Sequence, residues 1–223
     1  MRRRLLLLRH GEVDYFPHGK PVPPEGVGLT ERGRVQAEAV RTLLASVPLD
    51  LAVHTGLPRT QETLALVLKG RNTPVEIWPE FQEIRPGALK ALPNPERAFR
   101  EAFYPRDLQE RFLGGERYAD FLDRLLPAYE RLLQKPWETL LLVAHGGVIR
   151  ALLSYALTGQ RGFLPLEVHP CGLSVLDLGE PNLLRVHNLT PYDPLPHRRI
   201  STMEELWEAY RTGRAHTTPP GPE

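Results

Sequence analysis

The sequence predicts an α/β protein: a three-layer sandwich with a mostly parallel central sheet, helices on both faces and a helical lid-like insertion at about residues 85–115. The main observation is a unit that occurs three times, in which a short apolar run leads through a polar turn into a helical pattern. The apolar runs are Leu5–Leu8, Asp50–Val53 and Thr139–Val143. Short apolar runs bounded by charge or glycine are typical of strands that are buried on both faces of a parallel sheet.

A helical pattern follows each apolar run, and further elements complete the sheet. The predicted helices cover residues 31–44, 59–68, 118–133, 148–157 and 203–211. Thr30 is a favourable N-cap for the first of them, and Pro58 suits the first turn of the second. The positions of the first helix that are spaced for a buried face are Val35, Ala39, Leu43 and Leu44. A short strand is predicted at 75–78, and a hairpin at a sheet edge pairs 173–178 with 183–187.

The segment 85–115 differs from the rest of the chain in composition. It holds four prolines, the pair Gly114-Gly115 and the aromatic residues Phe99, Phe103, Tyr104 and Phe112. We interpret it as a helical insertion that covers a site at the end of the sheet. A length of 223 residues suits one substantial core. We therefore predict a single domain over residues 1–216 and a disordered tail at 217–223.

The overall composition argues against several classes of protein. A net charge of +1 gives no global field that would recruit nucleic acid or an anionic membrane, and no stretch approaches the roughly 20 apolar residues that span a bilayer. The single cysteine, Cys171, excludes an internal disulfide, and the eight histidines show no spacing typical of a metal site. We expect a cytoplasmic protein without metal or cofactor that binds neither nucleic acid nor membrane. A homodimer is compatible with the sequence.

Charged residues follow the predicted strands at the point where each strand ends. Arg9 and His10 follow the first strand, Arg59 comes shortly after the second, and His145 follows the third. Because the carboxyl ends of neighbouring parallel strands share one edge of the sheet, these side chains can surround one small ligand. Arginine binds phosphate oxygens through two parallel hydrogen bonds and stays charged at all working pH values. The pattern therefore predicts a small phosphate ester as the ligand.

The glycines after the two histidines, Gly11 and Gly146, let the backbone approach a ligand and aim N–H groups at an oxyanion. Histidine has an unperturbed pKa of roughly 6.5, so a neutral His10 ring is available as a nucleophile that becomes phosphorylated. A leaving alkoxide needs a proton, and Glu83, which follows the strand at 75–78, is the preferred donor. The sequence thus predicts a phosphomonoester as the substrate of this site.

Five segments, taken in order along the chain, resemble the motifs of a known protein family. They cover residues 7–12, 29–37, 55–63, 81–87 and 143–150. Together they resemble the histidine phosphatase superfamily, which includes the cofactor-dependent phosphoglycerate mutases. The resemblance implies that His10 is phosphorylated and that Glu83 donates the proton. It also implies that Arg9, Arg59 and His145 bind the phosphoryl group and that no metal is needed.

Two features separate this chain from the mutases of that superfamily. Phe16 stands where many members have an asparagine that contacts substrate phosphate, and the paired arginines of the mutases' insertion are absent. We therefore predict a metal-independent phosphomonoester hydrolase, with a phosphoglycerate mutase and a catalytically weak phospho-ligand-binding member as open alternatives. Candidate substrate contacts are Glu12, Phe16 and Glu116. The aromatic residues of 85–115 favour a more apolar rim than small sugar phosphates would need.

Overall fold

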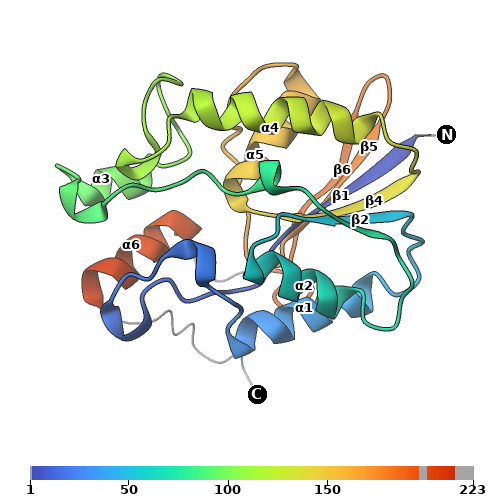
Figure 1. Cartoon of the computed structure of the whole chain (residues 1–223), viewed down its shortest axis with the longest axis horizontal. Coiled ribbons are helices and arrows are strands. Elements are labelled where there is room, and N and C mark those ends of the chain that lie inside the picture. The colour runs from blue at the N-terminus through green and yellow to red at the C-terminus, as the bar shows by residue number, and fades with distance from the viewer. Residues whose placement is uncertain (1, 196–199, 214–223) are drawn as a thin grey trace.

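A six-stranded, mostly parallel sheet forms the centre of the protein, with helices on both of its faces (Figure 1). A computed structural model describes residues 2–195 and 200–213. The strands are β1 (Arg3–Arg9), β2 (Leu51–His54), β3 (Val75–Ile77), β4 (Thr139–Ala144), β5 (Leu173–Leu178) and β6 (Leu183–Leu189). The helices are α1 (Glu31–Leu43), α2 (Pro58–Val67), α3 (Pro95–Arg100), α4 (Tyr118–Leu133), α5 (Gly146–Thr158) and α6 (Thr202–Thr212). The strands are ordered β3-β2-β4-β1-β5-β6, which confirms the predicted α/β architecture.

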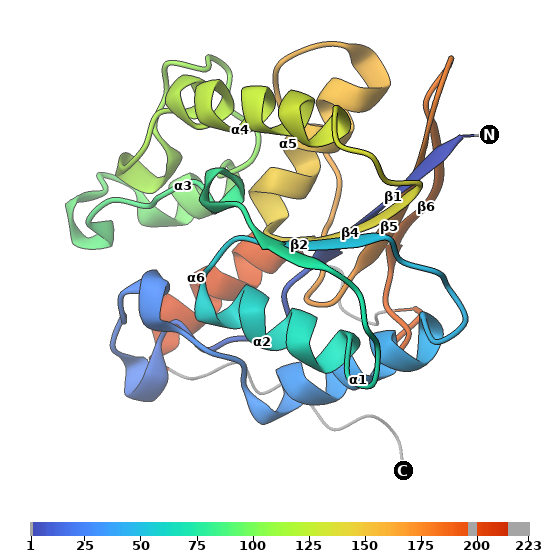
Figure 2. The same ribbon diagram turned by 45° about the vertical axis from the view of Figure 1, so that its right-hand side comes forward.

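The four leucines of β1 show why the apolar run is continuous. β1 pairs in parallel with β4 and antiparallel with β5, so it lies inside the sheet. Leu5 and Leu7 belong to the core layer that contains α4 and α5, whereas Leu6 and Leu8 belong to the layer that contains α1 and α2. Successive side chains of a strand point to opposite faces. Because helices cover both faces (Figure 2), all four positions must be apolar.

Helix α1 turns a different face to the core from the one that its apolar residues predict. Of the four predicted core positions only Leu44, just after the helix, is buried, and Val35 and Leu43 are 58% and 40% exposed. The buried residues of the helix are Gly33, Gln36, Ala37 and Val40. The prediction was wrong because the loop after β1 packs on this helix: Oε1 of Gln36 accepts a hydrogen bond from the Glu12 amide at 2.9 Å.

The other predicted elements agree with the structure to within a few residues. Thr30 caps α1 by accepting a hydrogen bond from the amide of Gly33 at 3.0 Å, and Pro58 lies in the first turn of α2. Helix α4 has the predicted bounds, and β5 and β6 form the predicted hairpin, with β6 at the edge. The tail predicted at 217–223 lies outside the described residues. None of the helices within the described ranges is long and apolar enough to cross a membrane.

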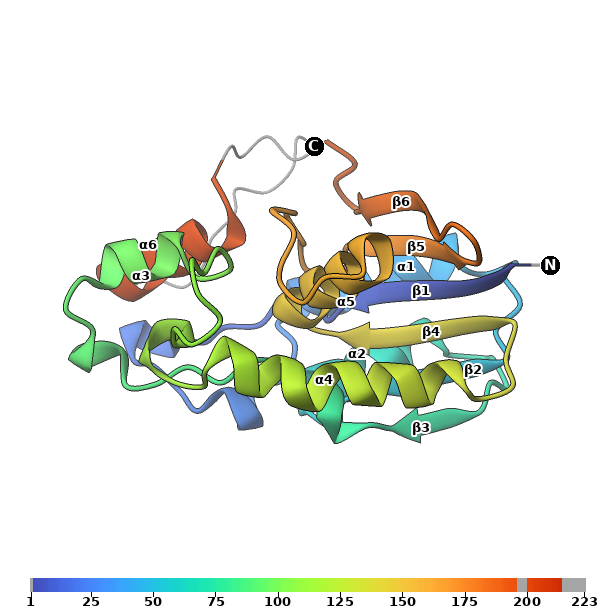
Figure 3. The ribbon, with the colours of Figure 1, turned by 90° about the horizontal axis from the view of Figure 1, so that it is seen from above.

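The insertion at 85–115 and helix α6 lie beyond the carboxyl ends of the parallel strands (Figure 3). The insertion contains α3 and short 3-10 turns, so its predicted helical character is confirmed. Helix α6 packs against α3: the ring of Phe99 lies 5.8 Å from that of Trp207 and 6.1 Å from that of Tyr210 between centroids. Segments from the middle and the end of the chain therefore meet above the edge of the sheet where a ligand is expected.

Candidate active site

Two histidines lie side by side at the carboxyl ends of β1 and β4. His10 directly follows β1, and His145 directly follows β4 as the N-cap residue of α5. Because β1 and β4 are neighbours, the two ring centroids are 5.2 Å apart, with an interplanar angle of 61°. Both side chains are almost fully buried, at 3% and 1% exposure. The structure therefore brings together the two histidines that the sequence assigned to one site.

The hydrogen bond made by His10 determines which of its ring nitrogens is available for chemistry. Nδ1 lies 2.8 Å from the carbonyl oxygen of Gly11. A carbonyl oxygen can only accept, so Nδ1 carries the proton and Nε2 of the neutral ring holds a free electron pair. Burial, followed by the positive charges of Arg59 and Arg9, lowers the pKa of His10 well below its usual value. The ring is therefore neutral and nucleophilic at neutral pH.

A chain of hydroxyl groups determines the tautomer of His145 in the same way. Thr60 donates its hydroxyl proton to the carbonyl oxygen of Leu57 at 2.8 Å, so it accepts from the hydroxyl of Thr55 at 3.0 Å. Thr55 in turn accepts from Nε2 of His145 at 3.1 Å. Nδ1 of His145 is left buried without a partner. Burial first, and nearby positive charge second, lower the pKa of His145 well below its usual value.

Four buried nitrogen atoms beside these rings have no hydrogen-bond partner. They are Nε of Arg9, Nε of Arg59, Nδ1 of His145 and Nη1 of Arg150, and no other buried side-chain nitrogen or oxygen in the described ranges is unpaired. Each of the three arginines donates a hydrogen bond from another guanidinium nitrogen to a backbone carbonyl. The pairs are Arg9 with Val168, Arg59 with Pro24 and Arg150 with Leu166. Buried polar groups are nearly always paired. Three of the four are guanidinium N–H donors, and Nδ1 of His145 becomes a donor when its ring is protonated, so the site fits a ligand with several acceptor oxygens.

Arg150 belongs to this group although the sequence reasoning gave it no role. Its guanidinium carbon lies 4.5 Å above the ring centre of Phe103, and burial lowers the pKa of the group. A Cβ atom added to Gly146 would lie 2.9 Å from Nη1 of Arg150 and 3.9 Å from Nε of Arg9. Both arginines therefore flank the same turn. The signal for Arg150 in the sequence is that it is the single charged residue in α5, with apolar residues on both sides.

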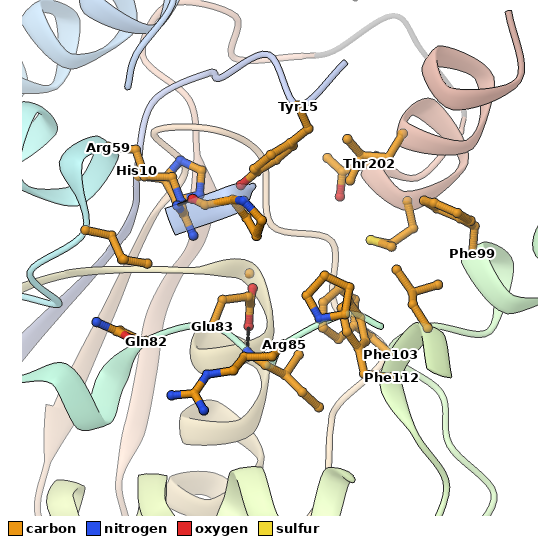
Figure 4. Close-up of a pocket in the computed structure, with 18 of the residues that line it drawn as sticks. His10, Tyr15, Arg59, Gln82, Glu83, Arg85, Phe99, Phe103, Phe112 and Thr202 are labelled. Atoms are coloured by element: carbon orange, nitrogen blue, oxygen red, sulfur yellow. Dashed lines mark hydrogen bonds between the residues drawn. The ribbon is translucent and has the colours of Figure 1, made fainter. Parts of the chain in front are cut away.

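Glu83 faces the pocket from the loop that follows β3. Its Oε2 atom accepts a hydrogen bond from the amide of Gly147 at 2.9 Å, and its Oε1 atom accepts one from the amide of Ile84 at 3.0 Å. In Figure 4 the carboxylate lies on the wall below His10 and Arg59. The structure thus places the predicted proton donor in the same pocket as the predicted nucleophile.

A cavity of about 420 Å³ opens beside these groups, and Phe16 is among the residues that line it. Tyr15 also lines the cavity, although its position in the loop after β1 was the only signal for it in the sequence. The ring of Tyr15 lies 5.9 Å from the guanidinium carbon of Arg59, and Figure 4 shows its hydroxyl end directed toward His10. Tyr15 therefore joins the set of side chains that a ligand in this cavity would meet.

Two of the candidate substrate contacts have other partners. Glu12 accepts a hydrogen bond from the hydroxyl of Thr30 at 2.9 Å, and Glu116 forms an ion pair with Arg124 at 3.1 Å. Neither carboxylate is among the residues that line the cavity. Over residues 2–195 and 200–213, no group of three or more His, Cys, Asp or Glu side chains is placed to hold a metal ion.

The two glycines assigned to phosphate binding differ in their surroundings. The amide of Gly11 already donates to Oγ1 of Thr63 at 3.0 Å. A Cβ atom on Gly11 would also lie 2.6 Å from the carbonyl oxygen of Gly33, so glycine is needed here for close packing of the loop on α1. Gly146, in contrast, lines the cavity at the first turn of α5, where backbone amides and the helix dipole favour an anion.

Such a pocket suits a phosphoryl group, and the fold and the site together define an enzyme of phosphoryl transfer. The chain belongs to the histidine phosphatase superfamily (branch 1), whose family model matches residues 5–188. The match begins in β1 and ends in β6, so helix α6 lies beyond it. The family that the five sequence segments indicated is thereby confirmed.

Known relatives include phosphatases and a mutase. The adenosylcobalamin/alpha-ribazole phosphatase of Salmonella typhimurium is 32% identical over 161 residues, which are 70% of this chain and 80% of the relative. The 2,3-bisphosphoglycerate-dependent phosphoglycerate mutase 2 of Gloeobacter violaceus is 31% identical over 160 residues, 67% and 73% of the two chains. The solved structure of the alpha-ribazole phosphatase of Shigella flexneri gives a TM-score of 0.68 at 28% identity, covering 83% of this chain and 96% of the other.

Proposed function

We propose that this protein hydrolyses phosphomonoesters without a metal ion, through a phosphohistidine formed on Nε2 of His10. The observation that carries this proposal is the set of four unpaired buried nitrogens on Arg9, Arg59, His145 and Arg150. Phosphate oxygens are acceptors that arginine and histidinium nitrogens would satisfy. A transferred phosphoryl group held there would lie beside the neutral ring of His10.

In the first step Nε2 of His10 attacks phosphorus in line, and the bond from phosphorus to the ester oxygen breaks. The proton that the leaving oxygen requires comes from the carboxyl group of Glu83 in its protonated form, which leaves Glu83 as a carboxylate. The Gly11 carbonyl bonded to Nδ1 stabilises the positive charge that develops on the ring as the new bond forms. The products of this step are a free alcohol and a phosphorylated His10.

In the second step a water molecule attacks the phosphohistidine from the side that the alcohol has left. Glu83, now a carboxylate, takes a proton from that water, and the bond between phosphorus and Nε2 of His10 breaks. Inorganic phosphate is released, and both His10 and Glu83 return to their starting states. The same carboxyl group thus serves as the acid in the first step and as the base in the second, so the mechanism needs only one such group in the pocket.

The unpaired nitrogens stabilise the negative charge of the transition state. The phosphoryl group spreads negative charge over its equatorial oxygens as it moves, and fixed donors aimed at these oxygens lower the barrier. Arg9 and Arg59 are held by backbone carbonyls, so they need little reorganisation when the ligand arrives. A bound phosphate dianion would also favour protonation of His145 at Nδ1, since an adjacent negative charge stabilises the histidinium.

A mutase needs the same phosphoryl site and, in addition, polar contacts for a phosphoglycerate that turns within the pocket. Phe16 lines the cavity. It stands where many members of the superfamily have an asparagine that contacts substrate phosphate, and this difference favours a phosphatase. Incubation with 3-phosphoglycerate and 2,3-bisphosphoglycerate separates the two activities. We expect no interconversion of the two monophosphoglycerates, and the turnover that occurs should release inorganic phosphate.

The test of the mechanism is rapid quench with a radiolabelled phosphomonoester in the presence of a chelator. We expect a phosphoryl adduct that is stable to base and labile to acid, and its complete loss in His10→Asn. His18→Asn is the matched control, because His18 is exposed and lies outside the cavity lining. Turnover that persists in His10→Asn, or turnover that the chelator abolishes, contradicts the proposal.

Several expectations about the whole protein stay predictions. We propose one domain over residues 1–216, a small-molecule phosphomonoester as the substrate, and a cytoplasmic location with no nucleic-acid partner. A homodimer remains compatible with the chain. Size-exclusion chromatography with light scattering measures the oligomeric state, and limited proteolysis that leaves one protected fragment would support the single domain.

A further inference from the structure

The cavity beside His10 has a second, apolar end. Its wall there consists of the side chains of Phe16, Phe99, Phe103, Phe112, Met203 and Leu206. Figure 4 shows the three phenylalanines from the insertion on the side of the pocket away from His10 and Arg59. A volume of about 420 Å³ falls within the range of pockets that bury whole organic ligands, roughly 300–1,000 Å³. The apolar end is therefore available for the part of the substrate that is not phosphate.

The side chains of the apolar end carry no positive charge of their own, and Arg150, whose guanidinium lies over the ring of Phe103, is already assigned to the phosphoryl group. Four arginines are among the described residues that line the cavity. Three of them, Arg9, Arg59 and Arg150, lie at the end where the phosphoryl group is expected to bind, which we call the phosphoryl end. Arg85 is exposed, and in Figure 4 its guanidinium is directed away from the phenylalanines. The hydroxyl of Thr202 already donates to Oε1 of Glu167 at 2.7 Å. A carboxylate on the leaving group would lose its hydration here without a partner, whereas an apolar group would gain from burial.

Helix α6 supplies part of this wall and is held firmly in place. The ring of Tyr210 lies 5.6 Å from that of Phe16, and both Trp207 and Tyr210 contact the ring of Phe99. A capping box between Ser201 and Glu204 begins the helix. These contacts join α6 to the loop after β1 and to α3. Because α6 lies beyond the residues that the family model matches, its contribution to the pocket is additional to the shared phosphoryl site.

We propose that the substrate is a phosphate monoester of a bulky apolar alcohol, aromatic or long-chain alkyl, and that Met203 and Leu206 of α6 determine this preference. The inference rests on the proposed function, since it concerns the leaving group of that reaction. The phosphoryl group occupies the cationic end beside His10, and the alcohol extends toward α6. Small alcohols that carry a carboxylate, such as 3-phosphoglycerate, fit the same phosphoryl site but leave the apolar end empty.

The experiment measures kcat/KM for a series of n-alkyl phosphates from ethyl to hexyl. The leaving groups of this series have nearly equal basicity, so differences in rate report burial of the chain. Each methylene that enters the apolar end is expected to raise kcat/KM by up to about fourfold, the factor that corresponds to ~0.8 kcal/mol per buried CH₂. Hexyl phosphate is then favoured over ethyl phosphate on the order of a hundredfold, and 3-phosphoglycerate is a poor substrate.

Variants of α6 test whether this helix determines the preference. Leu206→Asn and Leu206→Ala should each reduce the ratio of kcat/KM for hexyl phosphate to kcat/KM for ethyl phosphate at least fivefold. Leu206→Met should keep most of the original ratio. Glu208→Gln is the matched control, because Glu208 is exposed and pairs with Arg211 on the outer side of the same helix. Circular dichroism and a thermal melt establish folding, and Leu206→Ala keeps the test valid if the asparagine variant does not fold.

The outcomes separate this inference from the proposed function. A rate that does not depend on chain length, together with turnover that His10→Asn abolishes, overturns the apolar leaving group and leaves the phosphatase intact. A steep chain-length dependence that the Leu206 variants do not change overturns the role of α6. Absence of both turnover and a phosphoenzyme with every ester contradicts the proposed function itself.

Discussion

The carboxylate of Glu83 accepts a hydrogen bond from the amide of Gly147, with Oε2 and N 2.9 Å apart. This contact joins the loop after β3 to the first turn of α5, two residues after His145. A Cβ atom on Gly147 would lie 2.4 Å from Oε1 of Glu83 and 2.7 Å from Cε1 of Phe103. The absence of a side chain at position 147 therefore allows the carboxylate to reach the pocket.

Substitution of Glu83 tests its role as the proton donor. Glu83→Gln keeps the shape of the side chain but cannot give up a proton, so alkyl phosphates should be hydrolysed on the order of 10²-fold more slowly or worse. The comparison is made in kcat/KM, which reports formation of the phosphohistidine and not the later step in which Glu83 acts as a base. For 4-nitrophenyl phosphate, whose leaving group needs no proton, kcat/KM should fall by less than tenfold. Glu80→Gln is the control, since Glu80 pairs with Arg131 at the surface. Equal slowing of both esters would assign the acid to another residue.

Substitution of Gly147 tests whether the position of the carboxylate matters. Gly147→Ala should reduce kcat/KM for alkyl phosphates at least tenfold, because the new methyl group overlaps the Glu83 carboxylate. The effect on 4-nitrophenyl phosphate should be smaller. Gly26→Ala is the control, because a Cβ at Gly26 meets no atom within 4 Å. An alanine variant that retains full activity on both esters would show that the carboxylate has room to move.

Two of the buried histidines, His10 and His145, make stability depend on pH. His10 and His145 have pKa values well below the usual value of 6.5 in the folded protein, so below about pH 6.5 the unfolded chain binds protons that the folded one does not. The free energy of unfolding should therefore fall as the pH drops below 6.5, by up to about 1.4 kcal/mol per pH unit and per histidine. Above pH 6.5 the two rings should have no such effect.

Denaturant titrations between pH 5 and 8 measure this dependence. His10→Gln and His145→Gln should each reduce the slope below pH 6.5, and His18→Asn should leave it unchanged because His18 is exposed. Inorganic phosphate should stabilise the protein most strongly at the acidic end, where it can accept hydrogen bonds from a protonated His145. A slope that is the same in all four proteins would mean that neither ring is kept neutral by the fold.

Arg150 should contribute to binding of the oxyanion. Its Nη1 atom is unpaired beside Gly146, whereas its Nε atom is bonded to the carbonyl of Leu166 at 2.6 Å. Arg150→Met keeps the apolar stem against Phe103 and removes the charge, so inhibition by inorganic phosphate should weaken by about tenfold or more. Arg150→Lys should recover only part of the loss, since one ammonium cannot hold Leu166 and reach the ligand together. Unchanged phosphate inhibition in Arg150→Met would exclude the contact.

The sequence determined the central framework of this protein because the signals are local. The leucine run of β1, Thr30 as an N-cap, Pro58 in a first turn and the bounds of α4 all follow from periodicity or from the conformational preference of single residues. The order of Arg9-His10, Arg59 and His145 along the chain was enough to place them at one edge of a parallel sheet.

The tertiary structure alone decided which atoms of these residues are free to act. Hydrogen-bond partners, rather than residue types, leave Nε2 of His10 available and Nδ1 of His145 unpaired, and they occupy Glu12 and Glu116 elsewhere. The buried face of α1 depends on a contact with a distant loop. The apolar end of the pocket joins α3 to α6 across about a hundred residues of sequence, and no local pattern encodes a contact between segments so far apart.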